Sequence, residues 1–184
     1  DIAFRGIDFS LAPFPVQDVS IGAALEALTG QPLGAAGTLA AAALLTDAIG
    51  RAAFPHTGFC GLMLPVLEDN VLAQRAMEGR LRVSDLLQWS AVCGTGLDTV
   101  PLPGDLEVSA LAGLLFDVAA LSSRLHKPLT ARLMPLPGKS AGDPVRFDFA
   151  YFAPGGVLAL DNKPSASSRL MQTDKLHVCQ HGSS

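Results

Sequence analysis

The segment from Ser90 to Asp105 holds the residue types in this chain that are best suited to chemistry. It reads Ser-Ala-Val-Cys-Gly-Thr-Gly-Leu-Asp-Thr-Val-Pro-Leu-Pro-Gly-Asp, and so combines a thiol, carboxylates, three glycines and two prolines. Glycine permits a positive φ and a close backbone approach, whereas proline fixes φ and removes a hydrogen-bond donor. We therefore expect a rigid turn that holds Cys93 and Asp98 beside exposed backbone N–H groups.

Cys93 is the first candidate for a catalytic group. It ends a short apolar run, 91–93, that we interpret as a strand, and Gly94, Thr95 and Gly96 follow it. Functional groups of α/β proteins gather at the carboxyl ends of strands, where turn amides lower a thiol pKa or bind an oxyanion. We assign these three turn residues to ligand binding. In the alternative interpretation, Cys93 is a small buried hydrophobic residue.

Asp98 is the second candidate for a catalytic group. Asp8, Glu68 and Asp69 also follow predicted strands, so one site mouth could hold all four carboxylates as a general base with ligand-binding partners. Asp69 and Asp105 are equally well placed as helix N-caps, and Glu68 as a first-turn acid. Alternatively, the whole of 94–104 is a structural turn in which Asp98 binds its own backbone amides.

Other side chains carry weaker signals. Arg132 and Arg5 are candidates for pairing with an anionic ligand, and His56 for acid–base chemistry on a loop, whereas His126 suits a helix C-terminus. Gly94-Thr95-Gly96 resembles half of a dinucleotide fingerprint, but prolines follow it instead of a helix. The Cys and His spacing does not predict a zinc site, oxygen-ligated Mg²⁺ or Ca²⁺ stays open, and the sequence names no cofactor.

Composition narrows the class of protein. The chain has 184 residues, of which 49% are hydrophobic and only 16% charged, so we expect its apolar faces to be covered by a partner segment or a second copy. A surface rich in Ala and Gly is the alternative. The net charge of −4, with scattered Lys and Arg, argues against nucleic acid. The apolar run 33–49 reads as a core helix, so we expect no membrane span.

The organisation along the chain indicates an α/β domain over residues 1–160 and a polar tail over 161–184. Strands are expected at 2–9, 59–66, 91–93, 131–136 and 147–152. Helices are expected at 21–28, 37–54, 70–77, 85–89 and from Asp105 to about 125, with Ser20, Asp69, Ser84 and Asp105 as caps. This alternation predicts a mainly parallel sheet. The three cysteines indicate free thiols and a reducing, cytoplasmic location.

Several of these segments carry a family resemblance. Gly58–Asp69 and Ala91–Asp105, supported by Gly6–Pro13 and Leu129–Gly138, closely resemble the uncharacterised protein family 0210, or domain of unknown function 711. The resemblance covers roughly residues 1–160. It implies the C-terminal part of a longer protein, and part of an α/β barrel related to the ten-stranded barrel of glycyl-radical enzymes. The segment 153–157 departs from the glycyl-radical motif, so radical chemistry is not expected.

Two classes of function remain in competition. The first is an enzyme that acts on a small anionic metabolite, with Cys93 and Asp98 at the barrel mouth. The second is a non-catalytic protein that binds a small molecule, or a regulatory protein, on an enzyme-derived fold. Fold alone does not choose between the two classes. In either case the expected partners are a small-molecule ligand and either an N-terminal segment of the same protein or a second copy of the chain.

Overall fold

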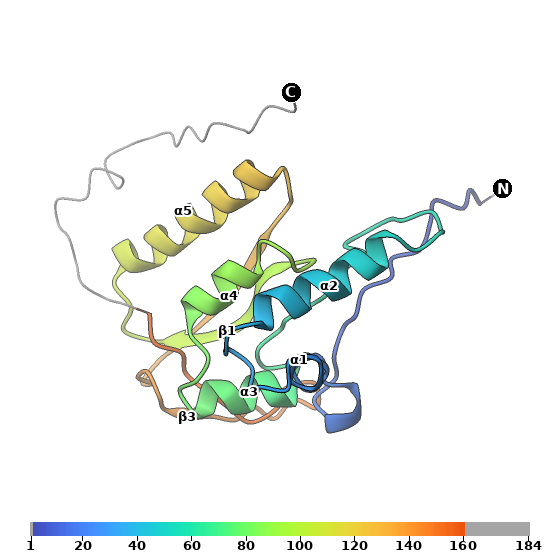
Figure 1. The fold of residues 1–184 in the computed structure, drawn as a ribbon. Coiled ribbons are helices and arrows are strands. Elements are labelled where there is room, and N and C mark those ends of the chain that lie inside the picture. Colours follow the sequence, from blue (N-terminus) through green and yellow to red (C-terminus); the bar gives the residue numbers. More distant parts are fainter. Residues whose placement is uncertain (1, 161–184) are drawn as a thin grey trace.

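The framework of the molecule is a parallel array of extended segments joined by helices (Figure 1). A computed structural model places residues 2–160. The expected polar tail, 161–184, lies outside the described residues. The elements in chain order are η1 (Gln17–Val19), α1 (Ile21–Thr29), α2 (Thr38–Gly50), α3 (Asn70–Met77), α4 (Val83–Trp89), β1 (Gly96–Pro103), α5 (Val108–Leu125), β2 (Thr130–Leu136), β3 (Pro144–Val145) and β4 (Gly155–Gly156).

The parallel array follows the order of the chain. Residues 7–11 form isolated parallel bridges with residues 56–62, and Pro65 forms one with Asp98 at the start of β1. β1 then pairs in parallel with β2. Each crossover between neighbours contains at least one helix, as a parallel connection requires. Within residues 2–160, β2 pairs only with β1, so its other edge is free.

The larger core lies between β1 and the helices. Leu97, Val100 and Leu102 of β1 belong to one buried cluster with residues of α4 and α5. α4 packs on β1 and α5 packs on β2. A smaller cluster around Leu67 and Val145 contacts Met134 and Leu136 of β2. Because side chains alternate along a strand, β2 contributes Leu133 to the larger core and its even-numbered neighbours to the other face.

A β-bulge in β1 sets which side chains face this core. Leu97 pairs with Ala131 and Val100 with Leu133, so two residues of β1, Asp98 and Thr99, lie opposite the single residue Arg132. The extra residue keeps Leu97 and Val100 on the same face despite their odd spacing. Thr99 takes a φ of 44°, which is unusual for a β-branched residue. Its hydroxyl accepts a hydrogen bond from the Leu67 amide at 3.2 Å.

The expected strands are only partly confirmed. The strand at 131–136 is confirmed as β2, but 91–93 is wrong: the amides of Ala91 and Cys93 instead bond back to Gln88 and Trp89 in turns that follow α4. Cys93 therefore precedes the amino end of β1. The expected turn at 94–104 is mostly the buried strand β1.

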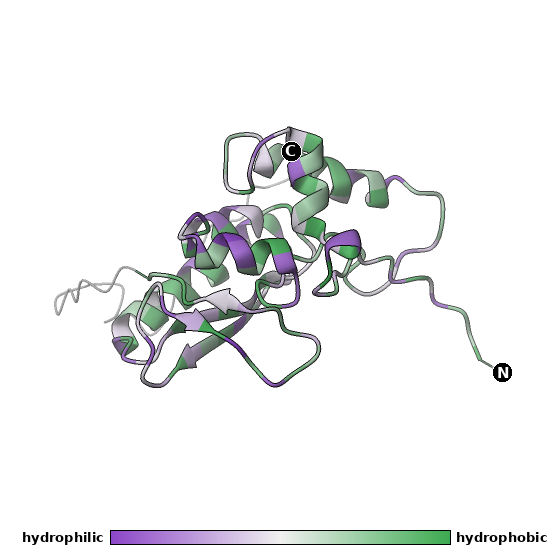
Figure 2. Cartoon of the chain, turned by 90° about the horizontal axis from the view of Figure 1, so that it is seen from below, coloured by the Kyte–Doolittle hydropathy of each residue, from purple (hydrophilic) through white to green (hydrophobic). Residues whose placement is uncertain are grey.

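Three other expected strands are wrong for local reasons. The segment 59–66 is buried at Leu62, Leu64 and Val66 as expected, but Cys60 takes a φ of 44° and the pairing is reduced to isolated bridges. Among residues 2–9 only Ile7 forms a bridge, with His56, and the N-terminal end of the segment runs out from the rest of the molecule (Figure 2). Residues 147–152 form bends and turns, in which the Phe152 amide bonds to the Phe149 carbonyl at 3.1 Å.

The helices agree better with expectation. All five expected helices are confirmed as α1 to α5, with Ser20 and Asp69 as N-caps of α1 and α3, although α2 ends at Gly50 and not at 54. The caps expected at Ser84 and Asp105 are wrong, because Arg82 and Glu107 take those positions. By length and composition alone α5 could cross a membrane, which is weak evidence for such a role.

Asp69 joins the beginnings of two helices. Its Oδ1 accepts from the Ser20 hydroxyl at 2.8 Å and from the first amides of α3, at 2.9 and 3.0 Å. Its Oδ2 accepts from the Ile21 and Gly22 amides of α1, at 2.6 and 3.1 Å. A Cβ on Gly22 would lie 2.8 Å from the Val71 side chain, so glycine permits this close approach. Asp69 is fully buried and its lone pairs are engaged.

We predict that Asp69→Ala lowers the free energy of unfolding by about 3 kcal/mol or more, because buried donors at two helix ends lose a charged acceptor. Urea denaturation followed by circular dichroism measures this loss. Asp105→Ala is the control, since Asp105 is exposed and does not cap α5, and its effect should be under about 0.5 kcal/mol. Equal midpoints for the two variants would contradict the double-cap role.

Candidate functional site

Three charged side chains from separate segments meet beside the β-bulge. The Arg132 Nε donates to Asp98 Oδ1 at 2.5 Å, and its terminal Nη2 donates to Glu68 Oε1 at 2.7 Å. Asp98 is in the bulge of β1, Arg132 is opposite it in β2, and Glu68 follows the segment that bridges to β1. The bulge thus brings together residues that are 34 and 64 positions apart in the chain.

The Asp98–Arg132–Glu68 cluster lies on the face of β2 away from α5. Arg132 shares that face with Met134, by the alternation of side chains along the strand, whereas Leu133 packs into the larger core. The three side chains differ in exposure: Arg132 is 53% exposed, Glu68 26% and Asp98 6%. A ligand approaching this face therefore reaches the guanidinium and Glu68 first, while Asp98 supports them from beneath.

The charges of the cluster keep Arg132 protonated and leave it able to donate hydrogen bonds to a ligand. The pKa of Arg132 is raised, chiefly by its hydrogen bond to Asp98 and further by attraction to both carboxylates. One cation between two carboxylates leaves a formal charge of −1. A guanidinium has five N–H donors, and the two bonds named above leave others on a side chain that is 53% exposed. The cluster can thus hold a substrate oxygen at Arg132 and exchange a proton at Glu68.

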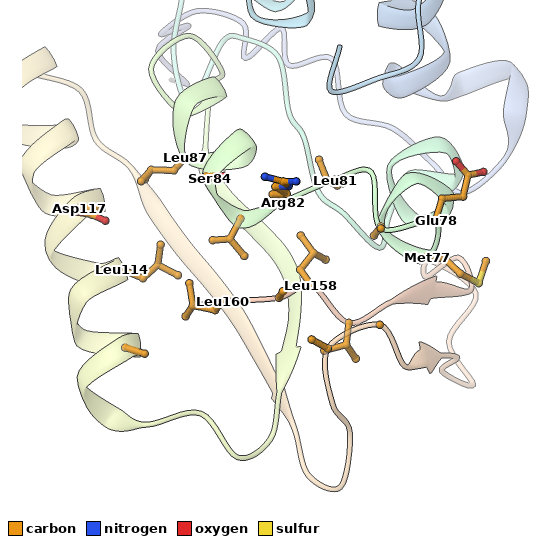
Figure 3. A pocket seen from close by; sticks show the side chains of 18 of the residues that line it. Met77, Glu78, Leu81, Arg82, Ser84, Leu87, Leu114, Asp117, Leu158 and Leu160 are labelled. Carbon is orange, nitrogen blue, oxygen red and sulfur yellow. The ribbon is translucent and has the colours of Figure 1, made fainter. Parts of the chain in front are cut away.

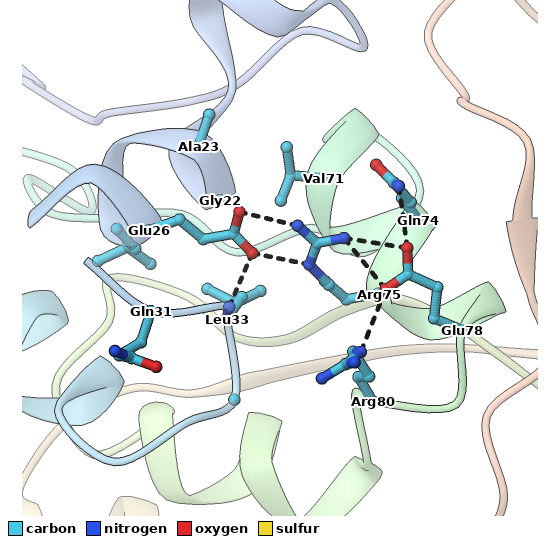
Figure 4. Close-up of polar contacts among 12 residues, drawn as sticks. Gly22, Ala23, Glu26, Gln31, Leu33, Val71, Gln74, Arg75, Glu78 and Arg80 are labelled. Carbon is cyan, nitrogen blue, oxygen red and sulfur yellow. Dashed lines mark hydrogen bonds and ion pairs between the residues drawn. The ribbon is translucent and has the colours of Figure 1, made fainter. Parts of the chain in front are cut away.

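A second cluster shows what the same residue types look like in a structural role. Arg75 of α3 also lies between two carboxylates, Glu26 of α1 at 2.7 and 2.8 Å and Glu78 at 3.0 Å (Figure 4). Glu26 additionally accepts from the Leu33 amide at 2.7 Å. The Arg75 side chain is only 16% exposed, and it fastens α1 to α3. The greater exposure of Arg132 is what separates the candidate site from this clamp.

The clamp predicts a pH dependence of stability. The hydrogen bond from Arg75 lowers the pKa of Glu26 below its ordinary value of 4.5. A carboxylate with a lowered pKa in the folded state stabilises the fold above its ordinary pKa, and that contribution is lost as pH falls through the lower folded value. We predict that Glu26→Gln is destabilising at neutral pH and that its difference from wild type shrinks below about pH 4.5. Urea midpoints against pH measure this, and a difference independent of pH would contradict the role.

Cys93 and its neighbours lie apart from this cluster. Cys93 is 1% exposed, and its Sγ accepts from the Gly96 amide at 3.2 Å. Cys93 and Gly94 line a cavity of about 410 Å³ that none of Glu68, Asp98 and Arg132 lines. Thr95 is buried, with a hydroxyl that has no partner among the described residues. The structure therefore separates the two side chains that the sequence analysis paired, and Cys93 lies at the amino end of β1.

The remaining predicted residues hold loops and helices. Asp69 is the double cap described above. Asp8 accepts from Ser10 at 2.6 Å and from the Cys60 and Phe59 amides at 2.9 and 3.3 Å. The hydrogen bond from the Ser10 hydroxyl is the largest cause of its lowered pKa. Asp8 thus orders the turn at 58–60, where a side chain on Gly58 would collide with its carboxylate.

Two larger hollows contain none of the predicted residues. One, of about 910 Å³, lies between α5 and the segment that joins α3 to α4, and Leu81, Leu114, Leu158 and Leu160 make its apolar wall (Figure 3). Arg82, Glu78 and Asp117 are at its rim. The other, of about 610 Å³, lies at the carboxyl end of β2. Among residues 2–160, no group of three or more His, Cys, Asp or Glu side chains has the arrangement of a metal site.

Two contributors, Thr99 and Lys127, could not be recognised from the sequence, and a third, Arg132, has partners other than the expected ones. Thr99 and its bulge were hidden by the Gly- and Pro-rich context of β1, which reads as a turn. Lys127 was not among the candidate residues, although its ammonium donates to the carbonyls of Ser90 and Cys93. Arg132 was considered as a partner for an anion, whereas the structure pairs it with two carboxylates of the chain itself. Its position within a motif of the family resemblance was the available signal.

The two carboxylates of the cluster should contribute differently to stability. We predict that Asp98→Ala costs about 2 kcal/mol, because it removes the buried carboxylate that accepts from Arg132, whose own charge stays half exposed. Glu68→Gln should cost less than about 1 kcal/mol, since that pair is more exposed. Guanidinium denaturation of both variants measures the difference. Equal losses would contradict the assignment of Asp98 as the supporting residue and Glu68 as the accessible one.

Comparisons with known proteins identify relatives over most of the chain. A family model described as "Uncharacterised ACR (DUF711)" matches residues 1–156. A "UPF0210 protein" of Pyrobaculum arsenaticum is 42% identical over 146 residues, which is 77% of this chain and 33% of that protein. One from Lacticaseibacillus casei is 35% identical over 166 residues, 88% of this chain and 36% of that protein. One from Syntrophobacter fumaroxidans is 39% identical over 150 residues, 79% of this chain and 33% of that protein.

The relatives are longer than this chain, and their names describe no function. The chain spans about a third of the length of the curated relatives it matches. Their printed names state no activity, so they identify the group of proteins without naming a reaction. No solved structure matches the chain.

Proposed function

Since the chain belongs to the uncharacterised DUF711 (UPF0210) family, we propose that it carries part of the active site of an enzyme that acts on a small polar metabolite, centred on Glu68, Arg132 and Asp98. The supporting observation is the meeting of these residues on an open sheet face, in hydrogen bonds of 2.5 and 2.7 Å. Each comes from a segment that carries the family resemblance.

Each side chain has a distinct role in this proposal. Arg132 holds a carboxylate or carbonyl oxygen of the substrate with its remaining N–H donors. Glu68, the more exposed carboxylate, accepts or returns a proton. Asp98 is a positioning residue, because its side chain is 6% exposed and it fixes the guanidinium through Nε. In this proposal Arg132 binds the anionic group of the substrate. The net charge of −1 on the cluster favours a substrate that also carries a proton-bearing group.

The surrounding architecture in this proposal is a mainly parallel α/β barrel. The parallel order of residues 7–11, 56–66, β1 and β2 supports it, as do the helical crossovers. Parallel sheets are normally covered on both faces, and a barrel removes free edges. We propose that the free edge of β2 pairs with a strand from the part of the family sequence outside the matched third. Free thiols at Cys60 and Cys93 support the cytoplasmic location that belongs to the same proposal.

The test compares Glu68→Gln with Glu78→Gln, because both glutamates are paired with an arginine that has a second carboxylate partner. Ligand-observed NMR against a panel of small hydroxy acids, amino acids and sugar phosphates finds compounds that bind, and each is then followed for conversion. We expect Glu68→Gln to keep binding through Arg132 and to lower conversion by about 10²- to 10⁴-fold. Glu78→Gln should change neither.

Two outcomes would count against the proposal. Conversion by Glu68→Gln at the wild-type rate would remove the acid–base role. Binding that depends on Arg132, with no conversion of any bound compound by the wild-type chain or by a full-length relative of the family, would favour the non-catalytic binding protein. The open guanidinium supports that alternative equally well, since holding an anion needs no proton transfer.

A further inference from the structure

The cavity of about 610 Å³ at the carboxyl end of β2 combines an apolar wall with two exposed cations, Lys139 and Arg146. Most of the wall consists of apolar side chains from α3, β2, β3 and the segment after β3: Met77, Leu136, Pro137, Val145, Phe147 and Pro154. None of the carboxylates among residues 2–160 lines this cavity. The proposed active site does not share a residue with it, so the two sites can be tested independently.

The wall of the cavity is held in place by the surrounding fold. Pro137, Pro144 and Pro154 present rings that have a fixed φ and no N–H donor that would need an acceptor. β3 pairs with β4, and a Cβ on Gly156 of β4 would lie 2.6 Å from the Met77 Cα, so β4 packs directly on the end of α3. A preformed wall lowers the entropic cost of binding a ligand.

Lys139 supplies the first cation, and its backbone is fixed at the ends of β1 and β2. Its amide donates to the Leu136 carbonyl and its carbonyl accepts from the Gly104 amide, both at 3.1 Å. Its ammonium donates to the Pro144 carbonyl at 3.1 Å, across the turn that leads into β3. An ammonium has three N–H groups, so two remain for a ligand on this exposed side chain.

Arg146 supplies the second cation, directly after β3. Its guanidinium has no hydrogen bond or ion pair within residues 2–160, whereas each of four other arginines pairs with a carboxylate: Arg51, Arg75, Arg80 and Arg132. Asp143 and Asp148 are close in the sequence but do not line the cavity. Two cations without a lining carboxylate give this place a local positive charge in a chain of net charge −4, which favours an anionic group.

We propose that this cavity binds an aromatic acid, with the ring of the acid against the apolar wall and its carboxylate between Lys139 and Arg146. The volume is in the range of small-molecule sites. The Phe147 and proline rings pack against a flat apolar ring, and the ammonium and guanidinium donate to the carboxylate oxygens. A hydrophilic anion would leave the wall in contact with water, and a neutral aromatic molecule would gain nothing from the cations.

Cinnamate, cinnamamide and acetate test the two parts of this proposal separately. Cinnamamide keeps the aromatic ring and removes the charge, whereas acetate keeps the carboxylate and removes the ring. Isothermal titration calorimetry gives a dissociation constant for each compound with the full chain. We expect cinnamate to bind about tenfold more tightly than either of the others, as one charge-assisted hydrogen bond or the burial of one ring would give. Added NaCl should weaken the binding of cinnamate but not that of cinnamamide, because exposed charges are screened.

Variants of the two cations assign the binding to this cavity. We expect Arg146→Gln and Lys139→Gln each to weaken the binding of cinnamate by about five- to tenfold and to leave that of cinnamamide unchanged. Both side chains are exposed, so the variants should fold, which circular dichroism checks. Arg5→Gln is the matched control, because Arg5 is also an exposed arginine and lies outside the cavity.

The proposal is overturned if cinnamate does not bind, or if cinnamate and cinnamamide bind equally tightly. It is also overturned if Arg146→Gln and Lys139→Gln both bind cinnamate with the wild-type constant. Binding that Arg132→Gln abolishes and Arg146→Gln leaves intact would place cinnamate in the proposed active site, and so rejects the cavity. Failure of the cavity leaves that active site unaffected, because none of Glu68, Asp98 and Arg132 lines it.

Discussion

The β-bulge opposite Arg132 is the constraint on which the arrangement of this molecule depends. One extra residue in β1 keeps Leu97, Val100 and Leu102 on the core side and places Asp98 against the guanidinium. A regular strand would send either the leucines or the carboxylate to the wrong face. The bulge forces Thr99 into a positive φ, which costs free energy. The hydrogen bond from the Leu67 amide to the Thr99 hydroxyl offsets part of that cost.

The clusters around Arg75 and Arg132 contain the same residue types, and the exposure of the arginine is what distinguishes the structural clamp from the candidate site. Arg75 and Arg132 each hold two carboxylates at similar distances. Arg75 is shielded between helices, where its bonds substitute for water, so its donors serve the packing of α1 on α3. Arg132 has partners of the same kind, Asp98 and Glu68, but 53% of its side chain is exposed, so solvent or a ligand reaches it.

The helices were predictable because their signals are local. Ser20 and Asp69 are caps, Gly30 takes the left-handed conformation after α1, and the apolar spacing of 111–125 marks α5. β2 was predictable from its own pattern. β1 was not, because Pro101 and Pro103 argue against a buried strand. The two prolines are tolerated because β1 uses carbonyl acceptors, and not N–H donors, toward the neighbouring segments. The carbonyls of Asp98 and Pro101 accept from the Val66 and Leu158 amides.

The candidate site could be predicted only in part, because it depends on pairing between distant segments. Asp98 and Glu68 were singled out by their motifs, and both belong to the cluster. Cys93 was grouped with Asp98 because the two are close in sequence. The strand that separates them points Asp98 toward Arg132 and leaves Cys93 before its amino end, in contact with Lys127. Sequence proximity was a poor guide here because a strand rises more than 3 Å per residue.

Asp69 also has a consequence for the order in which the chain becomes structured. The amides at the start of α1 find their acceptor 48 residues further along, at the start of α3. The first turns of α1 and α3 are not fully hydrogen-bonded until that loop closes. The hydrogen bonds formed at both helix ends then offset the entropic cost of closing the loop. The nascent helices thus form one cooperative unit. Their leading amides would exchange hydrogen with solvent in step, although the helices are separate in the sequence.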